Sequence, residues 1–352
     1  MSDISLLTYA LVFLGGMCAV LVLTPLAMRV ARSLGIVDRP APHKFHSQPT
    51  PYLGGLALAV VWLTGVLAPG SIRAQTVLIL IAASLVAVVG MLDDWRVLSP
   101  APRLIVQALA GVLLWVADVR VDPIGIPLLD LVITVFVVMA VTNALNLLDN
   151  MDGLLAGTAA IAAGYFFVLA FWQEQWLVAL MAVLLAGGCV GFLPYNLGGA
   201  RIFLGDAGAL FIGLLLAAIG IKVDLSGLPP LGRIAVPALI LAVPLFDMLL
   251  VVVSRRRGGR PVFRGGTDHS SHRLVAVGAS PRQAALLTYF AGTLAGGGAL
   301  LIAQVNEPWV TGLVVGLAVT LAVVLLALFE RVELGTTGTT TDAGSEARSG
   351  PT

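Results

Sequence analysis

The sequence predicts an all-α polytopic membrane protein of about 10–11 transmembrane helices, with the N-terminus outside and the C-terminus cytoplasmic. Three observations support this fold class. The chain is 59% hydrophobic and only 11% charged, with a mean hydropathy of +1.00, which does not fit a soluble globular domain. Long apolar stretches recur along it. The basic residues concentrate in alternate connections between those stretches.

The apolar stretches set the number of helices. Crossing about 30 Å of hydrocarbon takes roughly 20 apolar residues in a helix. Eleven such stretches lie at residues 5–30, 53–69, 74–92, 102–117, 128–147, 154–171, 175–193, 207–222, 234–253, 284–303 and 310–329. Only a short turn from Trp172 to Glu174 separates the sixth from the seventh, so the count is ten if the two are merged.

The distribution of cations sets the orientation, because short cytoplasmic loops retain Lys and Arg. With the N-terminus outside, 16 of the 20 basic residues fall on the inner side, and only Arg73, Arg120, Lys222 and Arg233 fall outside. The prediction is a multi-pass plasma-membrane protein whose polar motifs face the cytoplasm. A formal net charge of +1 argues against a nucleic-acid partner, which requires a concentrated basic surplus.

The domain organisation follows from these spans. Residues 1–333 are predicted to form one transmembrane domain with cytoplasmic loops at 31–52, 93–101, 148–153, 194–207 and 254–283. The tail at 334–352, rich in Gly, Thr and Ser, has no apolar period and is predicted to be a disordered cytoplasmic end.

Carboxylates and amides gather at three inner helix ends. Asp93 and Asp94, in GMLDDW, repel each other and call for a nearby cation, proton or metal; the alternative is a pair of solvated loop acids. In NALNLLDNMDG a polar stripe predicts a hard-cation or nucleotide site, or else hydrogen bonds between helices. Asp206, in FLGDAG, is predicted at a helix N-terminus, either as a Mg²⁺ ligand or as an N-cap.

Two inner loops carry the histidines. The segment His269-Ser-Ser-His272-Arg273 offers donors that suit phosphate oxygens, whereas its spacing matches no common zinc pattern. The cations at 255–257 are interpreted as topology determinants or contacts for anionic lipid. The loop at 43–55, with Lys44, is equally consistent with a structural or a binding role. Carboxylates, amides, His and Arg around a Mg²⁺ ion fit phosphoryl transfer.

Together these segments resemble the polyprenyl-phosphate N-acetylhexosamine-1-phosphate transferases, the MraY/WecA superfamily of glycosyltransferase family 4. GMLDDW is similar to the family's Asp-Asp motif, NALNLLDNMDGL to its Asn-x-x-Asn-x-x-Asp-Gly-x-Asp-Gly motif, and FLGDAG to its Phe-Met-Gly-Asp-x-Gly motif. HKFHSQPTPYLGG resembles its first cytoplasmic loop, and HSSHR its last cytoplasmic motif. The likeness extends in order to about residue 330.

The resemblance implies Mg²⁺-dependent transfer of a sugar 1-phosphate from a UDP-N-acetylhexosamine to undecaprenyl or decaprenyl phosphate, which releases UMP and starts a cell-envelope glycan. Mn²⁺ is the alternative metal. The resemblance also implies that Asp206 and Asn146 are the metal ligands. The implied catalytic carboxylates are Asp93, Asp94, Asp149 and Asp206, with Asp93 as the candidate for deprotonating the lipid phosphate. The implied substrate-binding residues are Lys44, Asn150, Met151, Asp152, Asn196, Phe203, His269, His272 and Arg273.

The sequence departs from the family pattern at two positions. Asn150 replaces a Gly beside the expected uridine pocket, and Ser271 replaces the middle His of the His-x-His-His-Arg motif of the WecA-like branch. HSSHRL and the following PRQA are nevertheless closer to that branch than to the muramyl-pentapeptide branch, which favours UDP-GlcNAc. Transfer of phospho-MurNAc-pentapeptide, or use of another UDP-sugar, is the alternative.

Two rivals from other classes are a membrane transporter and an inactive lipid-binding relative. Transporters place their sites near the bilayer midplane and show repeated halves, whereas these motifs lie at inner helix ends. The retained carboxylates argue against an inactive relative. For the enzyme, direct attack by the lipid phosphate is the first mechanism and an aspartyl intermediate the second. Members of the family are often dimers, so the resemblance also implies a homodimer.

Overall fold

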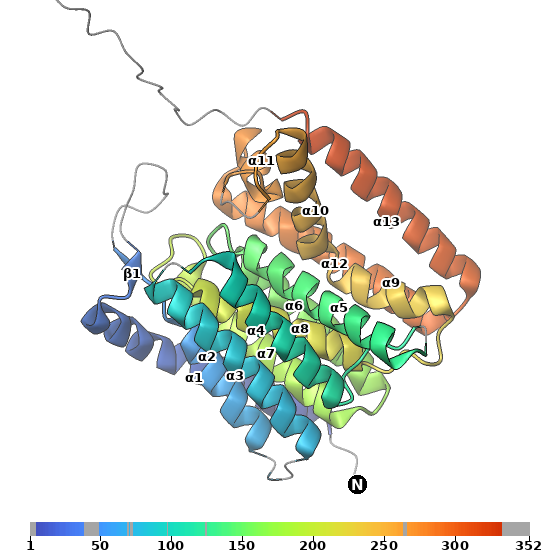
Figure 1. Ribbon diagram of the computed structural model, residues 1–352, viewed down its shortest axis with the longest axis horizontal. Helices are drawn as coiled ribbons and strands as arrows, with labels where there is room; N and C mark the ends of the chain where they lie inside the picture. The colour runs from blue at the N-terminus through green and yellow to red at the C-terminus, as the bar shows by residue number, and fades with distance from the viewer. Residues whose placement is uncertain are drawn as a thin grey trace, which may run out of the picture.

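The computed structural model describes residues 5–38, 49–68, 70, 73–96, 98–123, 125–262 and 266–332, and over them the chain is almost entirely helical (Figure 1). The helices are α1 (Leu6–Leu34), α2 (Gly54–Leu67), α3 (Ala74–Trp95), α4 (Pro100–Val116), α5 (Pro127–Leu148), α6 (Leu154–Trp172), α7 (Trp176–Asn196), α8 (Gly205–Lys222), α9 (Pro230–Ile240), α10 (Ala242–Arg257), α11 (Ser270–Ala276), α12 (Pro281–Val305) and α13 (Pro308–Phe329). Strands β1 (Val37–Asp38) and β2 (Thr50–Pro51) pair antiparallel. The predicted all-α class is confirmed. Lys44 and the predicted tail lie outside the described residues.

Local sequence explains several helix boundaries. A proline in the first turn needs no hydrogen-bond donor, and this position is occupied by Pro100, Pro127, Pro230, Pro281 and Pro308. Ser280 and Gln283 add a capping box to α12. Gly35, with φ of +71°, ends α1 in the left-handed conformation that glycine adopts without strain.

Within the described residues, eight helices are long and apolar enough to cross a membrane, or nine if the bent pair α9–α10 forms one span. The shorter apolar helices α2 and α4 complete the set, so helix occupies all eleven predicted stretches. The apolar stretch at 234–253 is divided between two helices, since α9 ends at Ile240, α10 begins at Ala242, and the two meet at 80°. Proline has no N–H group, so Pro244 cannot donate the helical hydrogen bond to the Ile240 carbonyl. The missing hydrogen bond lies at the bend between α9 and α10.

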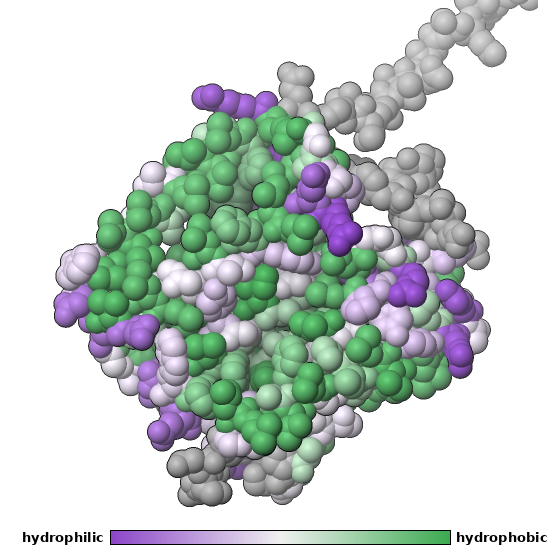
Figure 2. Space-filling view, turned by 180° about the vertical axis from the view of Figure 1, so that it is seen from behind, coloured by the Kyte–Doolittle hydropathy of each residue, from purple (hydrophilic) through white to green (hydrophobic). Residues whose placement is uncertain are grey.

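The interior of the bundle is centred on α7 and α8. Fifteen of the 21 residues of α7 and 15 of the 18 residues of α8 are buried. Helix α8 packs against α2, α3 and α5, and α7 packs against α1 and α6. Helices α9, α10 and α12 lie beside α5 and α6, while α13 forms the outer edge and buries only Val310 and Thr311 (Figure 1). Apolar residues cover most of the face in Figure 2, with hydrophilic patches toward its margins, as expected of a lipid-facing surface.

Glycines let α2 and α3 approach α8 backbone to backbone. A Cβ atom on Gly55 would lie 2.2 Å from Gly208, and one on Gly90 would lie 2.5 Å from the main chain of Asp206 and Ala207. Side chains at these two positions would push the helices apart. The close contact brings the C-terminal end of α3, which carries the paired aspartates, against the N-terminal end of α8.

Candidate active site

Asp94 caps the N-terminus of α8. Its Oδ1 accepts a hydrogen bond from the Asp206 main-chain N–H at 2.8 Å, and its Oδ2 accepts one from Ala207 at 3.1 Å. Gly205 adopts φ of +70°, and a Cβ there would lie 2.4 Å from Asp94 Oδ2. The first N–H groups of a helix have no partner within the helix, and here the Asp94 side chain accepts two of them. Asp94 therefore fixes the main chain of Asp206, and its implied catalytic role stays a prediction.

Arg103 joins Asp93 to Asp206. Its Nη1 lies 2.7 Å from Asp93 Oδ2 and 2.9 Å from Asp206 Oδ2. The second oxygen of Asp93 accepts the Leu98 N–H at 2.6 Å. Sequence reasoning treated Arg103 only as a topology cation. The available signal was its position, because it follows the paired aspartates within ten residues and lies in the first turn of α4.

The polar residues of α5 were predicted either to form a cation or nucleotide site or to make hydrogen bonds between helices, and different residues fit each role. Asn143 donates to the Gln107 side chain and to the Met139 carbonyl, which is the structural alternative. Asn146 instead donates from Nδ2 to Asp206 Oδ1 at 2.8 Å. Asp149 follows directly after α5 and is half-buried. Burial, together with the negative charges of Asp206 and Asp152, raises the pKa of Asp149 to about 7.

The donor set of this carboxylate cluster, defined as Asp93, Asp94, Asp149 and Asp206, fits Mg²⁺. Within the described part of the chain, no three His, Cys, Asp or Glu side chains converge to hold a metal alone. Mg²⁺ does not require three, because it commonly binds one or two carboxylates together with waters and substrate phosphates. Turning the Asn146 amide would present its oxygen beside Asp206, so that a cation there would meet one carboxylate and one amide oxygen.

The loop after α5 is joined to the loop after α7. Asn196, which is buried, accepts the Gly153 N–H at 2.8 Å and donates to the Ile202 carbonyl at 3.0 Å. Asp152 Oδ2 accepts the Ala200 N–H at 2.8 Å. Both side chains thus brace the two loops, and their predicted contacts with the nucleotide remain predictions.

Met151 and Phe203, two of the predicted substrate-binding residues, each contact apolar or aromatic neighbours within the protein. Met151 packs against the apolar cluster of Leu148 and Leu154. Phe203 is half-buried, with its ring centroid 5.9 Å from that of Tyr52. Tyr52 was not predicted. The carboxylates of Asp94 and Asp206 lie close enough to contribute to its raised pKa, after burial and Asp38.

A buried aspartate holds the start of α11, and sequence reasoning missed it. Asp247, fully buried in α10, accepts His269 Nδ1 at 2.8 Å, the Ser270 N–H at 2.7 Å and the Ser270 hydroxyl at 2.6 Å. An acid inside the apolar run PLFDMLL was the available signal. The His272 ring centroid lies 5.8 Å from that of His269, and burial followed by the neighbouring His269 lowers the pKa of His272.

Arg273 is engaged by protein groups at every guanidinium nitrogen. It donates to the Asp268 carbonyl at 3.2 Å, to the Ser254 hydroxyl at 2.6 Å, and to the Phe329 carbonyl and Glu330 carboxylate. It therefore joins α11 to the ends of α10 and α13. Its predicted role in holding substrate phosphates stays a prediction.

The cations at 255–257 were interpreted as topology determinants or contacts for anionic lipid, and Arg255 differs because it is buried in an ion pair. Only 2% of Arg255 is exposed, and its Nε lies 3.0 Å from Asp268 Oδ2. Arg260 contacts the other oxygen of the same carboxylate at 2.5 Å. A cation paired in this way fixes the loop between α10 and α11.

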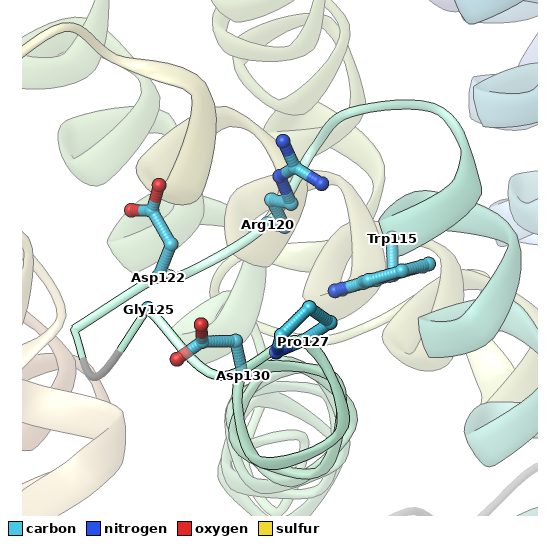
Figure 3. A pocket seen from close by; sticks show the side chains of 6 residues that line it. All are labelled: Trp115, Arg120, Asp122, Gly125, Pro127 and Asp130. Carbon is cyan, nitrogen blue, oxygen red and sulfur yellow. The ribbon is translucent and has the colours of Figure 1, made fainter.

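A pocket lies where α4 ends and α5 begins, at the ends of these helices that are opposite to the carboxylate cluster (Figure 3). It is lined by Trp115, Arg120, Asp122, Gly125, Pro127 and Asp130. About 16 helical residues, or roughly 24 Å, separate Asp130 from Asn146 along α5. This pocket is therefore remote from the carboxylate cluster.

Buried carboxylates and amides at the helix ends of an apolar bundle are typical of a functional site in a membrane protein. The sequence profile of glycosyl transferase family 4 matches residues 76–251. A probable undecaprenyl-phosphate N-acetylglucosaminyl 1-phosphate transferase of Bacillus subtilis (strain 168) is 30% identical over 305 residues, which cover 83% of this chain and 84% of the relative. The chain belongs to glycosyl transferase family 4, and it is a transferase.

Two further relatives indicate the branch of the family. The decaprenyl-phosphate N-acetylglucosaminephosphotransferase of Mycolicibacterium smegmatis is 31% identical over 335 residues, covering 84% of this chain and 82% of the relative. The phospho-N-acetylmuramoyl-pentapeptide-transferase of Bacillus pumilus is 37% identical, but over only 144 residues, or 41% of this chain and 43% of the relative. The extended similarity supports the WecA-like branch.

Proposed function

We propose that this protein transfers N-acetylglucosamine 1-phosphate from UDP-GlcNAc to a polyprenyl phosphate and releases UMP. The observation that carries the proposal is the carboxylate cluster, assembled with Asn146 and Arg103 from the ends of four helices. Such a cluster at the end of a membrane bundle suits a reaction between a soluble nucleotide and the head group of a lipid. The printed names of the Bacillus and Mycolicibacterium relatives support the same reaction.

Asp206 and Asn146 are the residues proposed to hold Mg²⁺, since their side chains lie 2.8 Å apart. When bound, Mg²⁺ would neutralise the sugar-nucleotide pyrophosphate and make its β-phosphorus more electrophilic. Arg103 holds Asp93 and Asp206 in fixed relation, and Asp94 holds the Asp206 main chain. The Asp93 carboxylate is proposed to take the proton of the lipid phosphate.

In the proposed reaction an oxygen of the lipid phosphate forms a bond to the β-phosphorus of UDP-GlcNAc. The bond from that phosphorus to the bridging oxygen breaks, and UMP departs with the electron pair. Asp93, Asp94 and Asp206 each accept two hydrogen bonds, which favours direct attack by the lipid phosphate over attack by any of these three carboxylates. Trapping radiolabelled phosphosugar on the protein without lipid would overturn the direct route.

The metal assignment has a matched control. Asp206→Ala is expected to abolish Mg²⁺-dependent turnover, because it removes the carboxylate at the centre of the cluster. Asp224→Ala is the control, since Asp224 lies in the connection after α8 and caps the Ser226 N–H. Near-normal turnover of Asp206→Ala would show that the metal ligands lie elsewhere.

We also propose that the cluster faces the cytoplasm from the plasma membrane. The support is the 16 to 4 division of basic residues in the sequence. Cysteines introduced at the exposed positions Ser226 and Arg256 flank the bent pair α9–α10. In intact cells an impermeant thiol reagent should label Ser226→Cys and spare Arg256→Cys; the opposite pattern would reverse the orientation.

The experiment that tests the transferase reaction is a donor panel. Purified protein with a short polyprenyl phosphate and Mg²⁺ is given UDP-GlcNAc, UDP-GalNAc or UDP-MurNAc-pentapeptide, and UMP is measured. UDP-GlcNAc is expected to give the highest rate. UDP-MurNAc-pentapeptide is the second candidate because of the partial similarity to the Bacillus pumilus relative. Release of UMP from none of the donors would defeat the proposal.

A further inference from the structure

A hydrogen bond joins the loop after α5 to α11. The Ser271 hydroxyl donates to Asn150 Oδ1 at 2.5 Å, across 121 positions of sequence. Ser271 has no exposed surface, and Asn150 is half-buried. Asn150 also donates from Nδ2 to the Leu147 carbonyl at 2.9 Å, so its amide is fixed against the last turn of α5. The bond therefore connects Asp149 and its neighbours to the segment that carries His269 and His272.

These two partners are the two positions at which the chain departs from the family pattern. A Gly at 150 has no side chain to reach α11, and a His at 271 extends well beyond the hydroxyl position of a Ser. Because Ser271 Oγ lies 2.5 Å from the Asn150 amide, an imidazole at 271 would overlap that amide. Asn150 does not adopt positive φ, so its backbone conformation does not require glycine. In this chain Asn150 and Ser271 each supply one side chain to the contact, and together they fill it.

The other contacts of α11 show what this pair contributes. Asp247 holds the start of α11 from α10, and Arg273 holds it to Ser254 and the end of α13. Those contacts fix α11 to the later helices. The bond between Ser271 and Asn150 instead fixes α11 to the loop after α5, which is where the carboxylate cluster ends at Asp149.

We propose that Asn150 and Ser271 form a compensating pair that positions α11, with its histidines, relative to the carboxylate cluster. Both are positioning residues. The expected effect on turnover rests on the proposed function, whereas the coupling between the two side chains does not. Misplacement of reacting groups by about 1 Å costs up to roughly 100-fold in rate, so a loss of this contact should be measurable.

The test is a double-mutant cycle of Asn150→Gly, Ser271→His and the double variant, read in full-length protein by melting temperature and by kcat/KM for UMP release. Each single variant is expected to melt several °C lower and to lose roughly 10- to 100-fold in kcat/KM, from an unfilled contact or from overlap. The double variant is expected to recover most of both losses, because the Gly makes room for the imidazole. The activity assay is run well below every melting temperature, so that a purely structural effect does not enter.

The matched control is Asn306→Gly combined with Ser271→His. Asn306 sits at the far end of α12 in the left-handed conformation that Gly accepts, and its amide donates to the Gly227 carbonyl. This combination should not rescue Ser271→His. Additive losses in the Asn150→Gly and Ser271→His cycle would overturn the pairing, and coupling in melting temperature without coupling in kcat/KM would overturn the positioning role. If the wild-type protein releases UMP from no donor, the proposed function fails, and the melting-temperature cycle still decides whether the pair exists.

Discussion

Replacing Arg103 by Gln removes the one described cation that touches two carboxylates of the cluster. Its Nη1 lies 2.7 Å from Asp93 and 2.9 Å from Asp206, and the three side chains are 25%, 7% and 30% exposed. A hydrogen bond to a charged group contributes about 1.5–3 kcal/mol. Partial exposure places each of the two hydrogen bonds of Arg103 at the lower end of that range. The variant is therefore expected to lose about 3 kcal/mol of the interaction free energy that positions Asp93 and Asp206.

Such a loss corresponds to about a 100-fold fall in kcat/KM, at about 1.4 kcal/mol per factor of ten. The Mg²⁺ concentration that gives half-maximal UMP release should also fall, because loss of the Arg103 cation makes the net charge of the site one unit more negative. Both quantities come from UMP release measured across a Mg²⁺ titration.

Arg96→Gln is the matched control for the Arg103 prediction. It makes the same change of charge at the end of α3, where the Arg96 guanidinium lies 5.1 Å from the Trp95 ring centroid. Its kcat/KM should stay within about twofold of wild type, as expected for an exposed surface cation. If Arg103→Gln behaves like Arg96→Gln, or requires more Mg²⁺ than wild type, the assigned role of Arg103 is refuted.

Three further predictions concern the loop around α11. Asp268→Asn leaves Arg255 buried without its carboxylate and should cost about 3–5 kcal/mol locally, seen as a lower melting temperature, whereas Arg260→Gln, which removes a half-exposed partner, should cost less than about 1 kcal/mol. Burial raises the pKa of Asp268, but hydrogen bonds from Arg255 and Arg260 outweigh it and leave that pKa below its ordinary value. The stabilisation is therefore present above about pH 4 and lost as pH falls through the lowered pKa, so the melting temperature of wild type should drop in acid more steeply than that of Asp268→Asn. Asp247→Asn should alter the pH dependence of kcat, because it replaces the carboxylate that accepts from His269; an unchanged profile would show that the contact is only structural.

Hydropathy was sufficient to locate the apolar helices, because hydrocarbon thickness fixes the length of an apolar span, but it did not locate the short helix α11. It did not foresee the 80° bend between α9 and α10. A proline in a membrane helix is compatible with a mild kink or with a break, and packing against neighbouring helices decides between them.

The carboxylate cluster was predicted as a set of residues but not as a set of contacts. Motif position identified Asp94 and Asp206, yet the role of Asp94 as the cap of α8 depends on how closely α3 approaches α8 through Gly90. Arg103 and Asp247 were missed for a related reason, since the carboxylates and histidine they touch are distant in sequence or lie on another helix. Periodicity gives the direction of a side chain on its own helix and does not give its partner.

The central claim is tested most directly by transfer of label from radiolabelled UDP-GlcNAc into extractable lipid. Wild-type protein with polyprenyl phosphate and Mg²⁺ should produce labelled lipid, and the label should be absent when the metal is chelated with EDTA or when Asp206 is replaced by Asn. Equal labelling in the presence of EDTA or by Asp206→Asn, or no labelled lipid from wild-type protein, would contradict the account.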